Sequence, residues 1–117
     1  MKFKKSLVLF EEALKDLEVG CYNKAVSSSY FAVRLMAEVL LEDLKTTKDD
    51  KIANAVGRIL GREVKEEIMW LFEERKKADH RPFFFDKERT SLIVERASKL
   101  LSVLKEEIER REREKSL

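Results

Sequence analysis

A chain of 117 residues has room for one domain with one hydrophobic core, and it is too short for two domains of ordinary size. Charged residues make up 41% of it, against roughly 25% in an average protein, and 3 glycines and 1 proline leave few turns, so we expect long helices and an all-α fold. The formal net charge of +2 excludes a global field of the kind that marks a nucleic-acid-binding protein, so any basic patch must be local.

Cysteine content and hydropathy exclude several other classes. Cys21 is the only cysteine, so an intramolecular disulfide and a thiolate metal site are excluded, and we expect it to be buried as a small hydrophobic residue. No apolar run approaches the roughly 18 residues of a membrane span, and the first residues lead into an amphipathic pattern without the apolar segment of a signal peptide. We therefore expect a cytoplasmic protein with no membrane contact, no metal ion and no cofactor.

The first two predicted helices differ in the amount of apolar surface they carry. A helix over about 3–19 has one narrow apolar stripe and is ended by Gly20. A second helix runs from Tyr22, or from Asn23 as its cap, to about Leu44, and it is apolar over most of its circumference. Such a helix is buried on more than one side, so we expect it at the centre of the fold, or buried in the core and again in a subunit interface.

Two further helices follow a polar connection. A short third helix over about 50–60 has Thr47 or Asp49 as its candidate cap and Gly61 at its end. A long fourth helix covers about 62–80.

The last part of the chain completes the predicted fold. The residue before Pro82 is pushed out of the α region, so the fourth helix should end there and residues 81–85 should form a loop. Asp86 can cap a fifth helix, whose charged continuation over 109–117 we expect to be a solvated, frayed tail. Four long helices and one short helix with short connections predict a single-domain, up-and-down bundle over residues 1–117.

The apolar stripe of the fourth helix is interrupted near its end. With Val64 set at 0°, Arg75 falls at about 20°, in the middle of the stripe, and Asp79 at about 60°. A guanidinium on an apolar face costs several kcal/mol unless it is paired, and Asp79, four residues on, is the obvious partner. The only histidine, His80, falls at about 160°, so within one chain it cannot point the same way as Arg75.

Residues 75–81, which we call the basic segment, carry a local positive charge. Four cationic residues against one carboxylate give 4 − 1 = +3, from Arg75, Lys76, Lys77 and Arg81 against Asp79. On the residues alone two interpretations stay open: a structural Arg–Asp pair with a histidine at a helix end, or an anion or phosphate site whose histidine moves a proton. If a two-fold dimer places the fourth helix at its seam, two basic segments would meet in a composite site.

Four other features invite a functional interpretation. The three phenylalanines at 83–85 are predicted to be a plug over the end of the bundle more readily than a surface for stacking bases. The serines at 27–29 suit close helix packing better than nucleophilic chemistry. Tyr30 should face the core, with its hydroxyl directed toward the basic segment, and Met69 and Trp70, off the inward stripe, favour a subunit interface.

At these residues the chain resembles the HEPN superfamily, small helical proteins named for higher eukaryotes and prokaryotes nucleotide-binding. The span from Arg75 to His80 matches the R-x4-6-H signature of that family, and Tyr30-Phe31-Ala32 within 23–41 is similar to its second helix. The similarity covers about residues 5–108. It implies a five-helix bundle that forms a two-fold homodimer, with the two signatures facing each other across a cleft.

The resemblance also implies an activity and roles for residues. Many HEPN proteins are metal-independent endoribonucleases that act as the toxin beside a minimal nucleotidyltransferase antitoxin, and others only bind nucleotides or partners. By this resemblance His80 would act as base or acid, Arg75 would stabilise the charge on the phosphorane, and Asp79 would orient Arg75. Accessory contacts to RNA or a nucleotide would come from Lys76, Lys77, Arg81 and Tyr30.

Two positions depart from common patterns of that family. Members under antitoxin control often carry a tyrosine two residues after the histidine, where this chain has Pro82. Another branch reads Arg-x-x-Ala-Asp-Tyr, and this chain keeps its Ala78-Asp79 context with His80 in the tyrosine position.

Overall fold

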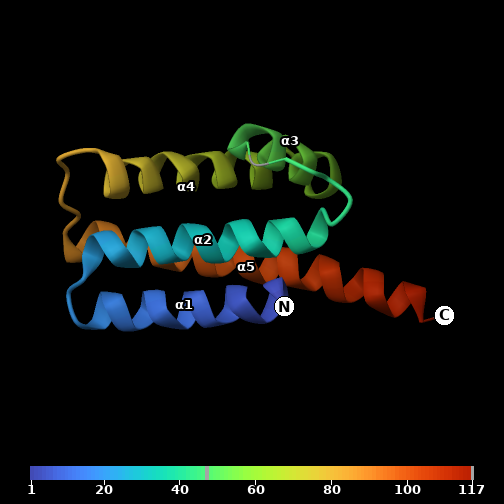
Figure 1. Ribbon diagram of the computed structural model, residues 1–117, viewed down its shortest axis with the longest axis horizontal. Helices are drawn as coiled ribbons and strands as arrows, with labels where there is room; N and C mark the ends of the chain where they lie inside the picture. Colours follow the sequence, from blue (N-terminus) through green and yellow to red (C-terminus); the bar gives the residue numbers. More distant parts are fainter. Residues whose placement is uncertain (47, 117) are drawn as a thin grey trace.

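The computed structural model describes residues 1–46 and 48–116 and forms five α-helices, without a strand, in those ranges (Figure 1). The all-α prediction is confirmed, as is the division into four long helices and one short one. The short helix has 12 residues, and the others have 17 to 29. Their bounds are α1 Lys2–Glu18, α2 Tyr22–Leu40, α3 Asp49–Leu60, α4 Arg62–His80 and α5 Lys87–Lys115.

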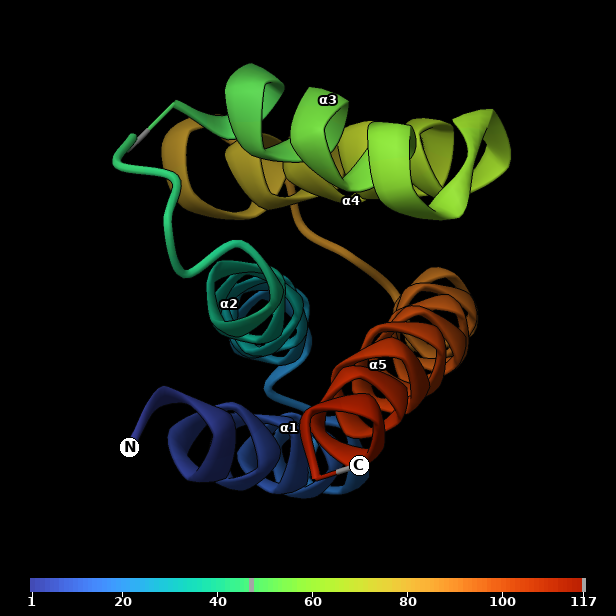
Figure 2. The same cartoon turned by 90° about the vertical axis from the view of Figure 1, so that its right-hand side faces the viewer.

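Helix α2 lies at the centre of the bundle and contacts all four other helices. In Figure 2 it is surrounded by α1 below, α5 to one side, and the layer of α3 and α4 above. Small residues such as Ala25, Ala32 and Ala37 are fully buried on it, which lets its neighbours approach closely. The predicted central helix is confirmed, and it is the element from which the candidate site is built.

Close approach also explains one glycine in α3. A Cβ placed on Gly57 would lie 2.9 Å from the Cβ of Lys65 in α4, so a side chain there would push the two helices apart. Gly61, with a positive φ of 103°, then ends α3 and lets the chain turn directly into α4, as predicted.

Two helix starts differ from the predictions. Asn23 is not the cap of α2: Cys21 holds that position, and it is exposed at the surface where the sequence predicts burial. Asp49 is the first residue of α3 instead of its cap, and Lys48 precedes it; the other candidate cap, Thr47, lies outside the described residues. The predicted cap of α5 is confirmed, because Asp86 accepts a hydrogen bond from the backbone N–H of Arg89 at 2.8 Å.

Two helix ends also differ. α2 ends at Leu40 and not near Leu44, because Glu42 and Asp43 place negative charge where the C-terminal end of a helix already concentrates it. In the other direction, α5 continues to Lys115, so the prediction of a frayed tail is wrong for residues 109–115.

Ion pairs along one side of α5 account for the extra helical turns. Glu107 accepts hydrogen bonds from Arg110 at 2.6 Å and from Arg111 at 2.9 Å. These bonds lower the pKa of the Glu107 carboxyl to about 2. Arg110 also pairs with Glu114 one turn on, so the charged end of α5 is held by contacts three and four residues apart.

None of the helices in the described part of the chain combines the length and the apolar character that a membrane crossing requires.

Candidate functional site

Arg75 lies on the inward side of α4 and packs against two aromatic rings of α2. Its guanidinium carbon is 4.9 Å from the ring centre of Tyr30 and 5.1 Å from that of Phe31. Its Nε is 2.8 Å from Oδ2 of Asp79, which confirms the predicted partner. The Nε–H makes no aligned hydrogen bond within the described residues, so this contact is chiefly electrostatic. The side chain of Arg75 keeps 23% of its surface exposed, although its Nε is buried.

Asp79 links the end of α4 to α2. One carboxylate oxygen faces Arg75, and the other accepts a hydrogen bond from the Ser27 hydroxyl. The serine run therefore does more than allow close packing: Ser29 is buried, and Ser27 orients the carboxylate that in turn orients Arg75. Beside this pair lies a shallow groove of about 260 Å³ between the first turns of α2 and the last turn of α4.

Tyr30 contributes its ring and not its hydroxyl to this site, which corrects the prediction. The residue is fully buried, and its hydroxyl donates a hydrogen bond to Asp49 at 2.8 Å and accepts one from Arg34 at 3.0 Å. Burial raises the pKa of the Tyr30 hydroxyl to about 12. The hydroxyl points to the start of α3 because Asp49 offers a charged acceptor there. Arg34, four residues after Tyr30 on the same helix face, was missed in the sequence, although this spacing is the available signal.

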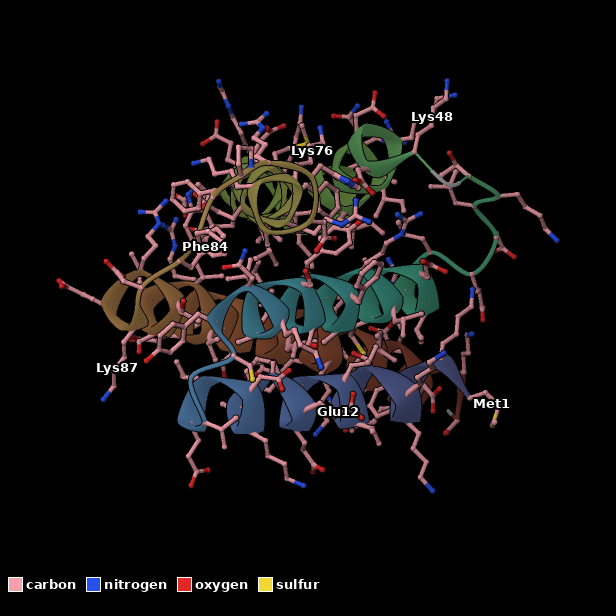
Figure 3. The ribbon with its side chains drawn as sticks, turned by 60° about the vertical axis from the view of Figure 1, so that its left-hand side comes forward. Met1, Glu12, Lys48, Lys76, Phe84 and Lys87 are labelled. Atoms are coloured by element: carbon pink, nitrogen blue, oxygen red, sulfur yellow. The ribbon has the colours of Figure 1, made fainter. Side chains whose placement is uncertain are left out.

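His80 is the last residue of α4 and is exposed. Its side chain makes no hydrogen bond to any other described residue, and the structure does not bring it to Arg75 within one chain, as the helix angles predict. Arg81 is exposed just beyond it. Lys76 lies on the outer side of α4, away from α2, and pairs with Glu73 (Figure 3). Lys77 is 3.5 Å from the carboxylate of Glu74.

Glu74 is a buried carboxylate that the sequence analysis missed. Only 2% of its surface is exposed, and one of its oxygens pairs with both Lys77 and Arg89 of α5. The other oxygen has no hydrogen-bond donor within the described chain. Its position one turn after Trp70 is the signal that could have placed it between α4 and α5.

Trp70 lies in the same contact between α4 and α5, which we call the α4–α5 seam. The guanidinium carbon of Arg96 is 3.9 Å from the centre of its ring, and that of Arg89 is 5.6 Å away. Arg96 also donates from Nε to Glu67 at 3.1 Å. Two arginines of the same chain thus cover part of Trp70. The subunit interface expected at Met69 and Trp70 stays a prediction, and both side chains remain partly exposed.

Asn23 fixes the connection between α4 and α5 with three hydrogen bonds from one side chain. Its Nδ2 donates to the carbonyl oxygens of Ala78, at 3.2 Å, and Phe83, at 2.8 Å, and its Oδ1 accepts from the N–H of Phe85 at 3.0 Å. The residue expected to cap α2 therefore holds the end of α4 and the loop that follows His80.

The three phenylalanines of that loop do not share one environment. Phe85 is 5% exposed and closes the end of the core, as the plug prediction requires. Phe83 packs edge-to-face on Phe85 at 4.8 Å and is partly covered. Phe84 is 90% exposed, so the plug prediction is wrong for this residue.

No group of three or more metal-ligating side chains lies within residues 1–46 and 48–116. Neither the scan against protein-family models nor the search of curated proteins gives a match to this chain. The residues with functional potential are a partly exposed arginine oriented by two rings and a carboxylate, an exposed histidine five residues later, and exposed cations beside them.

Proposed function

We propose that the protein is a metal-independent endoribonuclease of the HEPN type that acts as a two-fold homodimer. The observation that carries this proposal is the placement of Arg75, which is held by Tyr30, Phe31 and Asp79 and still presents part of its surface to solvent five residues before exposed His80. An arginine with a purely structural role needs only the two rings and the carboxylate that hold it. The exposed edge and the exposed imidazole are what a phosphodiester would contact.

The chemistry requires a proton acceptor and a fixed cation. His80 takes the proton of a ribose 2′-hydroxyl, the 2′-oxygen attacks the adjacent phosphorus, and the bond from phosphorus to the 5′-oxygen breaks. Arg75 stabilises the negative charge on the phosphorane oxygens, and Asp79 keeps the guanidinium in place. A water molecule donates a proton to the leaving 5′-oxygen and recovers one from the protonated His80, which gives a 2′,3′-cyclic phosphate and a 5′-hydroxyl.

Two copies of the basic segment provide those groups. His80 and Arg75 are directed to different sides of α4, at about 160° and about 20°, so a single chain cannot bring both to one phosphate. A two-fold axis beside the end of α4 places His80 of one copy near Arg75 of the other. Lys76, Lys77 and Arg81 then border the RNA-binding surface.

The test is cleavage of RNA in the presence of a metal chelator. Arg75→Ala and His80→Ala should each lower the rate of cleavage by roughly 10²–10³-fold, because each removes a group that acts in the transition state. Lys105→Ala, a cation on α5 outside the basic segment, is the matched control and should leave the rate unchanged. Helical circular dichroism and thermal unfolding should show that all three variants fold. Full activity in both site variants would refute the proposal.

A second candidate function is a non-catalytic module that binds a nucleotide or a minimal nucleotidyltransferase partner through the same surface. The observation in its favour is that His80 has no hydrogen-bond partner among the described residues to orient its imidazole as a base. This function predicts binding without turnover. Calorimetric titration with mononucleotides should then give heat that Arg75→Ala removes, and absence of heat with nucleotides and with a nucleotidyltransferase would count against it.

A further inference from the structure

Phe84 is an aromatic side chain presented to solvent, and the proposed chemistry does not use it. With 90% of its surface exposed, it is more exposed than any other aromatic residue in the described chain; Phe83, the next, reaches 43%. An exposed phenylalanine contributes nothing to the core, and here its two neighbours, Phe83 and Phe85, pack against each other without it.

The backbone on either side of Phe84 is fixed. Asn23 accepts from the N–H of Phe85 and donates to the carbonyl of Phe83, so both peptide groups that flank the exposed ring are held by one side chain. Phe85 is inserted into the core, and Asp86 caps α5 immediately afterwards. The ring of Phe84 is therefore held outward by the structure around it.

Cationic residues lie near Phe84 in the sequence, on both sides of the loop. His80, Arg81 and Lys87 are all exposed, and neither Arg81 nor Lys87 forms an ion pair with any residue in the described ranges. Two neighbouring carboxylates are engaged, Asp79 with Arg75 and Asp86 with the start of α5, and Glu88 follows Lys87 in the first turn of α5. Figure 3 shows Phe84 beside the connection between α4 and α5, and Lys87 at the same end of the molecule but extending from the other side of α5.

We propose that Phe84 is a stacking platform for one unpaired base of RNA, with Arg81 contacting a phosphate beside that base. Every base has a π face, and an exposed ring beside cations is the arrangement by which proteins bind single strands. Single-stranded RNA is the occupant that these residues favour, because its phosphates carry the charge complementary to Arg81 and its bases offer flat faces to Phe84, and a contact with a second copy of this chain is an outcome that the test distinguishes. The inference deepens the proposed function, since it assigns selectivity for unpaired RNA to a residue outside the cleavage chemistry.

Binding measured apart from cleavage tests this inference. The full chain carrying His80→Ala keeps the probe intact, and fluorescence anisotropy reports its binding to a labelled single-stranded RNA of roughly 10 nucleotides. Adding Phe84→Ala should weaken binding by roughly 5- to 100-fold, and Phe84→Trp should preserve it. Leu44→Ala is the matched control, an exposed apolar side chain in the α2–α3 connection, and should change nothing. A hairpin with its bases paired should bind weakly to every variant.

Four outcomes separate the possibilities. Loss of binding in Phe84→Ala with recovery in Phe84→Trp supports the platform, even if the parent chain proves unable to cleave RNA, in which case the proposed function alone fails. Equal affinity of Phe84→Ala and its parent, with or without cleavage, overturns the platform. No binding of single-stranded RNA by the His80→Ala chain overturns it as well. A shift from dimer to monomer on Phe84→Ala in sedimentation, with unchanged RNA affinity per subunit, assigns the loop to a contact between copies and also overturns it.

Discussion

Two regions of this protein combine the same three chemical groups, an arginine, an aromatic ring and a carboxylate, in different surroundings. Arg75 lies over Tyr30 and Phe31 and pairs with Asp79 at the end of α4. On the far side of α4, Arg96 lies over Trp70 and pairs with Glu67 in the α4–α5 seam. The stacking distances differ by only about 1 Å.

The difference is the balance of charge around each arginine. The groove beside Trp70 is bordered by three glutamates against two cations, so the positive charge of Arg96 is neutralised. Around Arg75 the only nearby carboxylate of the basic segment is Asp79, and exposed cations follow it. An arginine that packs on an aromatic ring therefore has a structural role where carboxylates surround it. Where few carboxylates lie nearby, it is a candidate anion-binding residue.

The largest expected effect separates the two arginines by function. Arg75→Met should lower RNA cleavage by roughly 10²-fold or more and change the free energy of unfolding by less than about 1 kcal/mol, because methionine fills the same space between the helices. Arg96→Met should leave cleavage unchanged. Cleavage rates and urea denaturation of the two variants make the comparison. If Arg75→Met stabilises the fold and retains full cleavage, Arg75 has a purely structural role, as Arg96 does.

The next prediction concerns the contribution of the α4–α5 seam to the free energy of unfolding. Arg89→Met should lower the free energy of unfolding by about 2 kcal/mol, because it leaves the buried carboxylate of Glu74 with Lys77 alone. Adding Glu74→Leu should restore most of the loss, since the uncompensated charge is then removed. Thermal or urea unfolding reports both variants. A double variant as unstable as Arg89→Met would show that packing, and not charge, dominates in the seam.

Tyr30→Phe tests how the site is tied to α3. The change keeps the ring under Arg75 and removes the hydroxyl between Asp49 and Arg34, so it should cost about 1–2 kcal/mol of stability and little activity. The pKa of Tyr30 is raised from 10.0 to about 12, so the folded chain keeps a proton that the unfolded chain loses. Its contribution to stability is complete below about pH 10 and is lost as the pH rises toward 12.

Urea denaturation at a series of alkaline pH values checks this prediction. The Tyr30→Phe variant should lack the part of the pH dependence that lies between 10.0 and about 12. An unchanged slope in that window would mean that other groups cause it.

The smallest expected effect concerns a carboxylate–arginine cluster without an aromatic ring. Hydrogen bonds from Arg110 and Arg111 lower the pKa of Glu107 from 4.5 to about 2, so the stability it contributes is present above about pH 4.5 and is lost as the pH falls toward 2. Helical circular dichroism should decrease slightly over this range, and Glu107→Gln should flatten the decrease. If Glu107→Gln and the parent lose helical circular dichroism equally as the pH falls, Glu107 does not stabilise the C-terminal end of α5.

From the sequence alone we could predict the features that depend on the geometry of a single helix, which are its position in the chain and the face on which each residue lies. The period of apolar residues gives the five helices, and the angle of Arg75 on α4 identifies it and Asp79 as a pair, which the 2.8 Å contact confirms. The same counting predicts that His80 points away from Arg75, and His80 is exposed at the last position of α4. These predictions need only the geometry of a single helix.

Contacts between helices could not be predicted in this way. Whether the hydroxyl of Tyr30 meets Asp49 or the basic segment depends on how α3 is placed beside α2, which the period does not determine. Asn23 has the composition of a cap, and only the approach of the α4–α5 loop gives its amide better partners. Glu74 looks like a surface glutamate until α5 covers it. In these three residues a polar group finds its partner in a part of the chain far away in the sequence.

The hydrogen bonds of Asn23 and Ser27 also place the candidate site late in the assembly of the chain. The residues they join are 52 to 62 positions apart, whereas α1 and α2 are neighbours joined by a short turn. Contacts between residues so far apart in the sequence form after local contacts, because the intervening chain must first lose conformational entropy. A ribosome-bound chain that has not yet released the end of α4 can already form the α1–α2 hairpin but cannot orient Arg75. A partial opening of the α3–α4 layer would likewise disable the site while leaving most helices intact.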